Sequence, residues 1–356
     1  MREEPFISVV MPVYNAQCYL DESVKSVLNQ TFSNIELILV DDCSKDKSGE
    51  ICDSWALADK RVKVVHLKKN RGAGNARNTG IELASGVYLA FMDADDYIEE
   101  NLYHEAVLSI GKSNLDMVIW GLTEDYYNND NKLVLQNVLS LEKRNCRDLV
   151  DVRKMVIELE RKTLFGYQWN RLYRMELIKE NNIRFEDSIL YEDFFFNVLV
   201  IKYIQSMSIL ESSAYHYKKR MNESITARFV PEYFKLSTRR VHEMYELYSL
   251  WGMCTKDVKD ILGNIYLRYI LSALMRNFDN RSNMTVVEIK VWLLAVITTE
   301  LYGAVSKYAA VKSKSLKVFR FFLNHRSVNC CCLMGKVAYW LKVKFPIVFS
   351  RARINK

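Results

Sequence analysis

Short apolar runs alternate with helix-like patterns over the first 115 residues of the chain. Runs of Val, Ile and Leu are typical of buried strands, whereas apolar residues spaced three and four apart indicate amphipathic helices. Strands are predicted at Ile7–Tyr14, Ile35–Val40, Val62–Leu67, Val87–Met92 and Asp116–Gly121. Helical spacing occurs at Leu20–Gln30 and Asn75–Ala84. This alternation predicts an α/β fold with a doubly wound, mostly parallel sheet and helices on both faces.

The pattern changes in the rest of the chain. Residues 125–165 are polar and then helical, and residues 166–225 contain clustered aromatic and acidic residues. From about Pro231 onward the spacing is helical almost throughout, for example at Ile261–Leu274 and Val286–Leu301. The sequence therefore predicts a mainly helical C-terminal region after the α/β part.

Polar residues follow three of the predicted strands directly. They are Tyr14-Asn15 after the first strand, Asp41-Asp42 after the second and Asp93–Asp96 after the fourth. Ligands of doubly wound sheets bind beyond the carboxyl ends of the strands. We therefore expect these side chains to line a site at that edge.

Asp93 and Asp95 lie two residues apart at the end of a strand, so their side chains point to the same side. Two converging carboxylates suit Mg²⁺ or Mn²⁺, which take one or two carboxylates plus phosphate oxygens. A solvated acidic turn is the alternative. Asp96, followed by Glu99, matches the capping box of a following helix.

The pair Asp41-Asp42 ends the second strand in the same way. A carboxylate at this place can accept hydrogen bonds from a ribose or from a base N–H. The alternative is a helix N-terminus capped by Ser44 or Asp46.

Residues 70–78 form the glycine-containing segment NRGAGNARN. Its glycines allow close backbone approach, and a helix N-terminus with Arg71 or Arg77 suits a diphosphate. The segment differs from the dinucleotide fingerprint because Arg77 replaces the last glycine and because it follows the third predicted strand. Hydride-transfer chemistry is therefore disfavoured, and a purely structural glycine turn remains an alternative.

Two acids, Glu192 and Asp193, stand directly before three consecutive Phe residues. Acids beside a buried aromatic run are costly to bury unpaired, so they fit the rim of a cleft, where a carboxylate can act as a general base. Helix capping by Asp193 is the alternative. The segments Trp169-Asn170-Arg171 and Tyr215-His216-Tyr217 supply aromatic rings that could stack on sugars, or that belong to the core.

Charge is unevenly distributed along the chain. From Leu301 onward there are twelve Lys and Arg residues and no acid, so the first 300 residues carry −5 although the whole chain carries +7. Bulky apolar residues mixed with these cations suit an amphipathic segment on an anionic membrane. A helical cap with a solvated basic face, or contact with nucleic acid, are the alternatives, and we expect no nucleic-acid partner.

Composition narrows the setting. Of the 356 residues 49% are hydrophobic and 26% charged, as in ordinary globular proteins. No window reaches about 18 uncharged apolar residues, and the acidic start does not resemble a signal peptide. The eight cysteines form no C-x-x-C pair. We therefore expect reduced cysteines in a cytoplasmic protein.

In combination these segments resemble glycosyltransferase family 2, the inverting nucleotide-sugar transferases with the GT-A fold. The matching segments are ISVVMPVYN, IELILVDDCSKD, NRGAGNARNTGIELASGVYLAFMDADD, WNRLYRMELIKENNIRFED, YEDFFF and YHYKKRMNESIT. The resemblance covers about residues 5–228. The order of the matching segments and their position at strand ends make the resemblance specific. It implies a nucleotide-sugar-binding half at 1–115 and an acceptor-binding half at 116–228. A helical C-terminal region with a basic membrane-associating tail follows at 229–356.

The resemblance also implies roles for individual residues. Those implied to bind the donor are Pro12, Val13, Tyr14, Asn15, Asp41, Asp42, Arg71, Arg77 and Asp93. Asp95, with Asp93 and His216, would hold a divalent metal. Asp193 would be the catalytic base, with Trp169 and Glu192 in the acceptor region. Cys43 departs from the family pattern, which has glycine after the paired acids.

The expected activity is transfer of a sugar from a nucleotide-sugar, with UDP favoured, to a hydroxyl of a saccharide. We expect Mn²⁺ or Mg²⁺ as cofactor and a glycan or lipid-linked acceptor from bacterial cell-surface polysaccharide biosynthesis. The basic tail would place the enzyme on the inner face of the plasma membrane. A sugar-phosphate nucleotidyltransferase and a non-catalytic nucleotide-sugar-binding scaffold are the alternatives.

Overall fold

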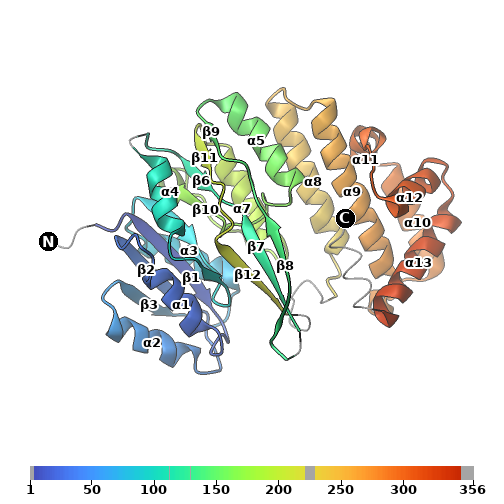
Figure 1. Cartoon of the computed structure of the whole chain (residues 1–356). Coiled ribbons are helices and arrows are strands. Elements are labelled where there is room, and N and C mark those ends of the chain that lie inside the picture. The colour runs from blue at the N-terminus through green and yellow to red at the C-terminus, as the bar shows by residue number, and fades with distance from the viewer. Residues whose placement is uncertain (1–3, 112, 129, 221–228, 346–356) are drawn as a thin grey trace. The chain divides into compact units, whose positions relative to one another are not determined.

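A computed structural model of the chain describes residues 4–111, 113–128, 130–220 and 229–345 (Figure 1). The chain divides into two compact units, Met1–Ser224 and Ile225–Lys356. The two predicted segments 1–115 and 116–228 together make up the first unit almost entirely. The predicted boundary after residue 228 closes the segment 221–228, which lies outside the described residues.

A large mixed sheet forms the centre of the N-terminal unit. Its strands are β1 (Ile7–Val13), β2 (Ile35–Asp41), β3 (Val62–His66), β4 (Tyr88–Phe91), β6 (Met117–Ile119), β9 (Arg144–Cys146), β10 (Arg171–Arg174) and β11 (Met207–Ile209). They lie in the order β3-β2-β1-β4-β10-β6-β11-β9. The first four strands are parallel, and β10 is inserted antiparallel between β4 and β6. The predicted α/β fold with a mostly parallel sheet is confirmed.

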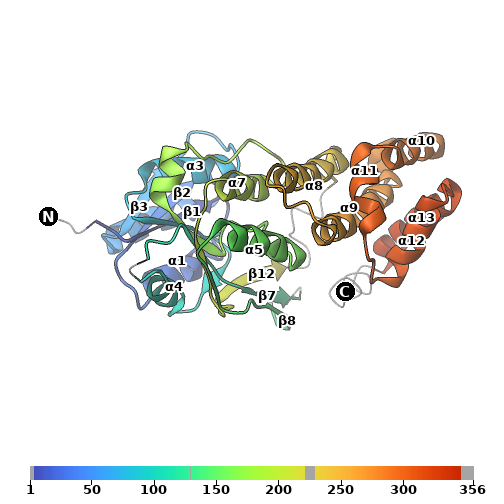
Figure 2. The same ribbon diagram turned by 90° about the horizontal axis from the view of Figure 1, so that it is seen from above.

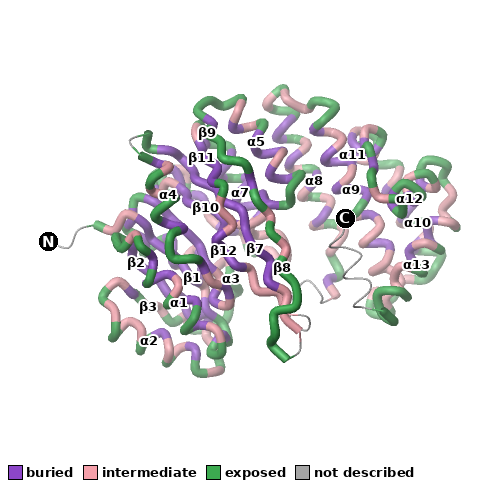
Figure 3. Tube along the Cα trace, viewed as in Figure 1, coloured by how far each residue is buried: buried purple, intermediate pink, exposed green. Residues whose placement is uncertain are grey.

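The central strands are buried on both faces, as their continuous apolar runs predict. Every residue of β2 is buried, and β1 is buried except at Pro12 (Figure 3). Val13 is the register partner of Asp41, so the carboxyl ends of β1 and β2 lie side by side at one edge. This register places the residues that follow both strands next to each other.

A second, four-stranded sheet has the order β5-β12-β7-β8. Its strands are β5 (Tyr97–Ile98), β7 (Leu122–Tyr127), β8 (Leu133–Leu139) and β12 (Tyr215–Arg220). The sequence pattern of residues 125–165, polar and then helical, predicted no strand there, so β8 was missed. Most of β8 is exposed (Figure 3), so no alternation of buried and exposed residues marks it in the sequence.

Helices cover both faces of the large sheet, as predicted. They are α1 (Leu20–Leu28), α2 (Ser48–Ala58), α3 (Ala73–Leu83), α4 (Leu102–Ile110), α5 (Leu149–Arg161), α6 (Met175–Glu180) and α7 (Glu192–Ile201). Figure 2 shows α1 and α4 on one face, and α3 and α7 on the other. Gly80 lets α3 lie close to β1, because a Cβ there would come within 2.2 Å of Val10 Cγ1.

The predicted capping role of Asp96 and Glu99 was wrong. Strand β5 follows Asp96 directly, and α4 begins only at Leu102, after Asn101. The buried Asp96 carboxylate instead accepts hydrogen bonds from Tyr215 Oη (2.8 Å) and from the Lys218 N–H (2.9 Å). It therefore joins the acidic loop after β4, residues 93–96, to strand β12.

The described part of the C-terminal unit is helical, which confirms the prediction. Its α-helices are α8 (Tyr233–Leu250), α9 (Lys256–Asn277), α10 (Val286–Ile297), α11 (Glu300–Val305), α12 (Lys314–Asn324) and α13 (Val328–Lys344). The segment predicted as one helix, Val286–Leu301, breaks at Thr298 and Thr299, where Thr299 caps α11. Gly335 allows α13 to approach α9, because a Cβ there would lie 2.6 Å from Leu274 Cγ.

The helices of the described residues differ in length and in apolar character, the two properties that a membrane span needs. None of the single helices in that part of the chain is both long and apolar enough to cross a bilayer. The pair Val286–Ile297 and Glu300–Tyr308 reaches that length and composition only jointly, across a bend of 56°.

Candidate active site

A buried arginine connects the acidic loop after β4 to the start of α7. Arg77, on α3, places Nη2 2.8 Å from Asp93 Oδ1 and Nη1 2.9 Å from Asp193 Oδ1. Glu192 Oε1 lies 3.9 Å from Nη1, and the guanidinium also stacks 5.4 Å from the Phe185 ring centroid. Asp93 and Asp193 lie 16 and 116 positions after Arg77 in the sequence, and both contact its guanidinium.

Gln168 completes this cluster from the segment before β10. Its side chain is fully buried. With the amide oriented to satisfy both of its atoms, Nε2 donates to Asp193 Oδ2 at 3.1 Å and Oε1 accepts from Arg77 Nη2 at 2.7 Å. Asp193 is thus fixed on one oxygen by a charged donor and on the other by a neutral one.

The carboxyl group of Asp193 has an unusual proton affinity. Burial is the largest effect on its pKa, which is raised to about 8. Repulsion from Glu192 and Asp93 raises the pKa further, and the positive charge of Arg77 lowers it. The residue lies in the first turn of α7, behind Tyr191, which adopts the left-handed conformation with φ of 66°. Asp193 is therefore not the cap of the helix, and a half-buried carboxyl with a raised pKa, which solvent and substrate can still reach, is suited to proton transfer.

The second carboxylate of the acidic pair has its own arginine. Asp95 Oδ2 lies 3.3 Å from Nη1 of Arg220, the last residue of β12, and the Asp95 side chain is 46% exposed. Arg220 stacks over the Tyr19 ring, with Cζ 3.7 Å from the centroid. Burial and the nearby Asp93 raise the pKa of Asp95, whereas Arg220 lowers it.

Aromatic side chains brace the acidic loop. Tyr215 Oη donates to Asp96 and accepts a hydrogen bond from the Asp93 N–H at 3.3 Å. Trp169 stacks on Tyr215 at 4.0 Å between ring centroids and on Tyr167 at 4.4 Å. The indole is almost fully buried, so Trp169 supports the site through Tyr215 in this structure.

The paired acids after β2 shape the neighbouring loops. Asp42 accepts hydrogen bonds from the backbone N–H groups of Arg71 (2.9 Å) and Gly72 (2.7 Å) and thereby holds the glycine segment. Asp41 accepts from the Ser44 N–H at 3.0 Å, and its other oxygen contacts His66 Nδ1 at 2.9 Å. Both carboxylates are buried and engaged with protein groups.

The loop after β1 is tied to the loop after β2. Asn15 accepts a hydrogen bond from the Lys45 N–H at 2.8 Å, and its own N–H donates to Ser44 Oγ at 3.0 Å. Tyr14 is 45% exposed beside them. Cys43 adopts φ of 60°, the left-handed conformation that favours the glycine expected there, so the turn keeps its geometry despite the substitution.

His216 lies on β12 among other side chains. Its Nδ1 is 2.8 Å from Asp125 Oδ2, its Nε2 is 3.2 Å from Glu99 Oε1, and its ring stacks on Tyr97 at 4.2 Å. The structure brings Asp93, Arg77, Asp193 and Glu192 together but places both His216 nitrogens against other acids.

The acidic pair fits a divalent cation in type of ligand and in charge. Within the described ranges no three His, Cys, Asp or Glu side chains gather into a complete metal site. Magnesium and manganese commonly take only one or two carboxylates and fill the remaining positions with water and substrate phosphate. Asp93 and Glu192 share the single guanidinium of Arg77 with Asp193, so even without a charge on Asp193 a further cation beside the two carboxylates would be favoured.

Sequence reasoning missed two residues of this site. Gln168 has no titratable group, and its neighbour Trp169 was selected instead because an aromatic ring can stack on a sugar. Arg220 ends a run of three cations on β12 and gave no sign of its contact with Asp95. Only the pairing of β12 with β5, which follows the acidic loop, could have pointed to it.

Comparisons with known proteins identify the family of the chain. A family model for glycosyl transferase family 2 matches residues 8–181. The chain is 30% identical over 278 residues to the uncharacterized glycosyltransferase EpsJ of Bacillus subtilis, covering 77% of this chain and 78% of EpsJ. It is 32% identical over 292 residues to the minor teichoic acid biosynthesis protein GgaB of the same organism, covering 76% of this chain and 29% of GgaB.

A solved structure shares the fold. The crystal structure of S. aureus TarS 1–349 in complex with UDP-GlcNAc matches with a TM-score of 0.63 and 22% sequence identity. The match covers 93% of this chain and 90% of that chain. It confirms the expected GT-A type fold.

Proposed function

The chain belongs to glycosyl transferase family 2 and is a glycosyltransferase, and we propose that it is a metal-dependent, inverting enzyme. The donor is a UDP-sugar, and the acceptor is a hydroxyl of a glycan in bacterial cell-surface polysaccharide biosynthesis. The observation that carries this proposal is the half-buried Asp193, held by Arg77 beside the Asp93–Asp95 pair. The UDP-GlcNAc complex of TarS supports the donor, and the teichoic acid protein GgaB supports the kind of product.

The reaction is a single displacement at the anomeric carbon. The acceptor oxygen forms the new bond while the bond to the diphosphate breaks, so the configuration inverts. Asp193 takes the hydroxyl proton, and Arg77 and Gln168 fix the orientation of its two oxygens. A positioned base of this kind contributes about 10²–10⁴-fold to the rate.

Donor binding uses the edge at which β1, β2 and β4 end. The tied loops after β1 and β2 offer Tyr14 and Asn15 to the nucleoside, and the N-terminus of α3 with Arg71 faces a diphosphate. Asp93 and Asp95 would hold Mn²⁺ or Mg²⁺. When bound, this cation neutralises the negative charge that develops on the leaving diphosphate.

The test compares Asp193→Asn with wild type for UDP release in the presence of acceptor and Mn²⁺. The amide keeps the shape of the carboxyl but cannot accept the proton. Turnover should therefore fall by about 10²-fold or more, while UDP affinity stays within about twofold. Asp187→Asn, at an exposed acid just before α7, is the matched control and should be neutral. Near-normal turnover of Asp193→Asn would show that the base is another group. Pyrophosphate as product would favour a nucleotidyltransferase.

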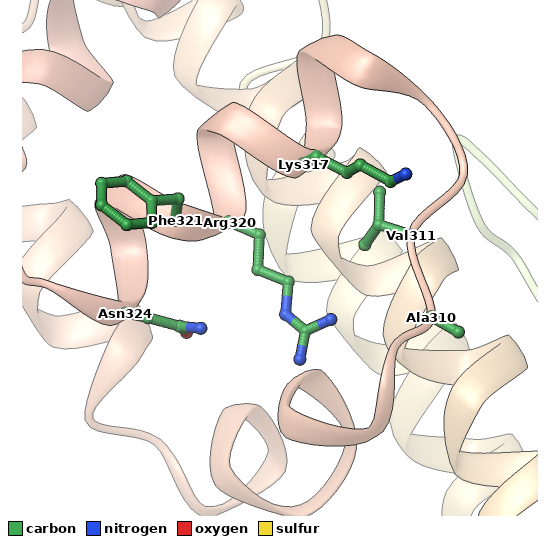
Figure 4. A pocket seen from close by; sticks show the side chains of 6 residues that line it. All are labelled: Ala310, Val311, Lys317, Arg320, Phe321 and Asn324. Atoms are coloured by element: carbon green, nitrogen blue, oxygen red, sulfur yellow. The ribbon is translucent and has the colours of Figure 1, made fainter.

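The proposal extends to a lipid-linked acceptor and an anionic membrane surface on the cytoplasmic side. In the C-terminal unit, α12 and α13 combine Lys and Arg with exposed apolar side chains. A shallow pocket of about 480 Å³ lies along α12 (Figure 4). It is lined by Ala310, Val311, Lys317, Arg320, Phe321 and Asn324. Cations beside apolar walls suit the phosphates and upper chains of lipids.

A further inference from the structure

Arg220 is the last residue of β12 and lies against the acidic loop after β4. Its Nη1 is 3.3 Å from Asp95 Oδ2, and its Cζ lies 3.7 Å from the centroid of the Tyr19 ring. Its Nε is buried and has no hydrogen-bond partner within the described part of the chain. The Arg220 side chain is 13% exposed, whereas that of Asp95 is 46% exposed. A mostly buried guanidinium therefore covers one oxygen of a carboxylate that solvent can reach.

The two carboxylates of the acidic pair are paired differently. Asp93 is held by Arg77, which also binds Asp193 and is almost fully buried, so this pair is locked into the cluster. Arg220 makes one longer contact with Asp95, and stacking on Tyr19 is its other strong contact. An incoming cation can break the Asp95–Arg220 pair at lower cost than the Asp93–Arg77 pair, because fewer interactions are lost.

We propose that Arg220 is the resident counter-ion of Asp95 in the ligand-free enzyme, and that it passes to the donor diphosphate when the divalent cation takes Asp95. The inference rests on the proposed function, since it requires a nucleoside diphosphate donor and a metal. It assigns a donor-binding role to a residue that the sequence had not singled out.

Charge balance favours this exchange. A guanidinium and a divalent cation on the same carboxylate repel each other, so metal binding weakens the hold of Asp95 on Arg220. The diphosphate brings new anionic oxygens to the same place. Guanidinium groups bind such oxygens through two parallel hydrogen bonds, and the unpartnered Nε can form such a pair with Nη2, which lies on the same edge of the guanidinium.

The exchange predicts opposite effects of one substitution on two ligands. In Arg220→Ala the competitor of the metal is gone, so Mn²⁺ alone should bind about two- to fivefold more tightly, the range of a partly exposed ion pair. UDP in the presence of saturating Mn²⁺ should bind about tenfold or more weakly, because a charge-assisted contact is lost. A purely structural role for Arg220 would weaken both ligands together.

The experiment is isothermal titration calorimetry on the full chain, first with MnCl₂ alone and then with UDP at saturating Mn²⁺. Arg220→Lys keeps the positive charge without the planar fork, and should leave Mn²⁺ affinity near wild type while lowering UDP affinity to an intermediate value. Arg144→Ala is the matched control. Arg144 Nη2 lies 3.4 Å from Asp151 Oδ1, a distance similar to that of the Arg220–Asp95 pair, but Arg144 belongs to β9 and not to the acidic loop, so neither affinity should change.

Four results would overturn the inference. Weaker binding of both ligands to Arg220→Ala, or unchanged UDP affinity in that variant, would refute the exchange while leaving the proposed function standing. If Arg220→Ala does not fold, unchanged UDP affinity in Arg220→Lys would refute it instead. Failure of the wild-type protein to bind UDP with Mn²⁺ would overturn the proposed function as well.

Discussion

Arg77 shows how much of the site depends on a single side chain. The sequence suggested that it faces the donor diphosphate, because it stands in a glycine-containing segment at a helix start. In the structure its guanidinium is instead surrounded by Asp93, Asp193 and Glu192. Burial lowers and these acids raise its pKa, with a net rise, so Arg77 stays charged and holds the base close to the acidic pair.

The raised pKa of Asp193 predicts a pH dependence of the reaction. Burial keeps the carboxyl protonated below about pH 8, and only the ionised form can accept the hydroxyl proton. At saturating Mn²⁺, kcat/KM should therefore rise about tenfold per pH unit toward pH 8 and then level off. A profile measured from pH 6 to 8.5 checks this, with thermal unfolding across the same range to show that the fold persists. A flat profile between pH 6 and 8 would contradict the assignment.

At the scale of elements, α3 sets the position of Arg77 through close contact with β1. Gly80 lies one turn after Arg77 and faces Val10, where an added Cβ would lie 2.2 Å from Cγ1 and 2.9 Å from Cγ2. The Val10 side chain leaves no room for a methyl group at this contact. Arg77 on α3 reaches Asp93 and Asp193 because α3 packs this closely against β1.

Gly80→Ala should therefore lower stability even though alanine is the better helix former. The overlap with Val10 costs about 1–3 kcal/mol, whereas helix propensity returns about 1 kcal/mol. Displacement of α3 should also lower kcat through Arg77. Urea unfolding of the full chain and turnover measure the two effects. Gly303→Ala in α11, where nothing lies within 4 Å, is the matched control and should be neutral or stabilising. Equal stability of both variants would contradict the tight contact.

The elements also show what the sequence could and could not reveal. Strands β1, β2 and β4 were predictable because their mainly apolar runs are buried on both faces. Strand β10 was not, because its residues Arg171–Arg174 contain two arginines and it enters the sheet antiparallel from a distant segment. Strand β7 was missed because Glu124 and Asp125 are buried on it, paired by contacts that no local pattern shows.

The site followed the same division. The acids could be found because each stands at the end of a strand or the start of a helix, where ligands of such sheets bind. Their partners Gln168 and Arg220 could not, because partners are chosen by tertiary contact between segments far apart in the chain. The sequence therefore predicted which groups carry charge, and the structure adds which cation neutralises each of them.

At the scale of the whole molecule, the chain separates an acidic first 300 residues from a basic end. Helix α13 carries exposed apolar side chains at Leu333, Val337, Trp340 and Leu341, a spacing that places them on one face of the helix. Removing the last 50 residues would be a poor test of membrane binding, because the buried Phe319 of α12 and the packing of α13 on α9 would be lost too. Substitution of exposed side chains leaves that core intact.

The membrane proposal predicts a specific loss for the double variant Leu333→Gln/Trp340→Gln. Each exposed apolar side chain that enters the lipid interface contributes on the order of 1 kcal/mol, so binding to vesicles containing phosphatidylglycerol should fall about tenfold or more. Leu57→Gln/Leu108→Gln changes two exposed leucines of the N-terminal unit and is the matched control. Co-sedimentation with these vesicles and with neutral phosphatidylcholine vesicles measures the effect.

The same assay distinguishes charge from apolar contact. Lys336→Glu, on the exposed surface of α13, should weaken binding to the anionic vesicles by about fivefold or more, since each cation near such a surface adds about 1 kcal/mol. The loss should shrink as salt is raised, because screening shortens the reach of the charge. Wild-type binding that is equal on neutral and anionic vesicles would contradict the role of the basic end. If both the Leu333/Trp340 and the Lys336 variants sediment like wild type, α13 is not the membrane-binding surface.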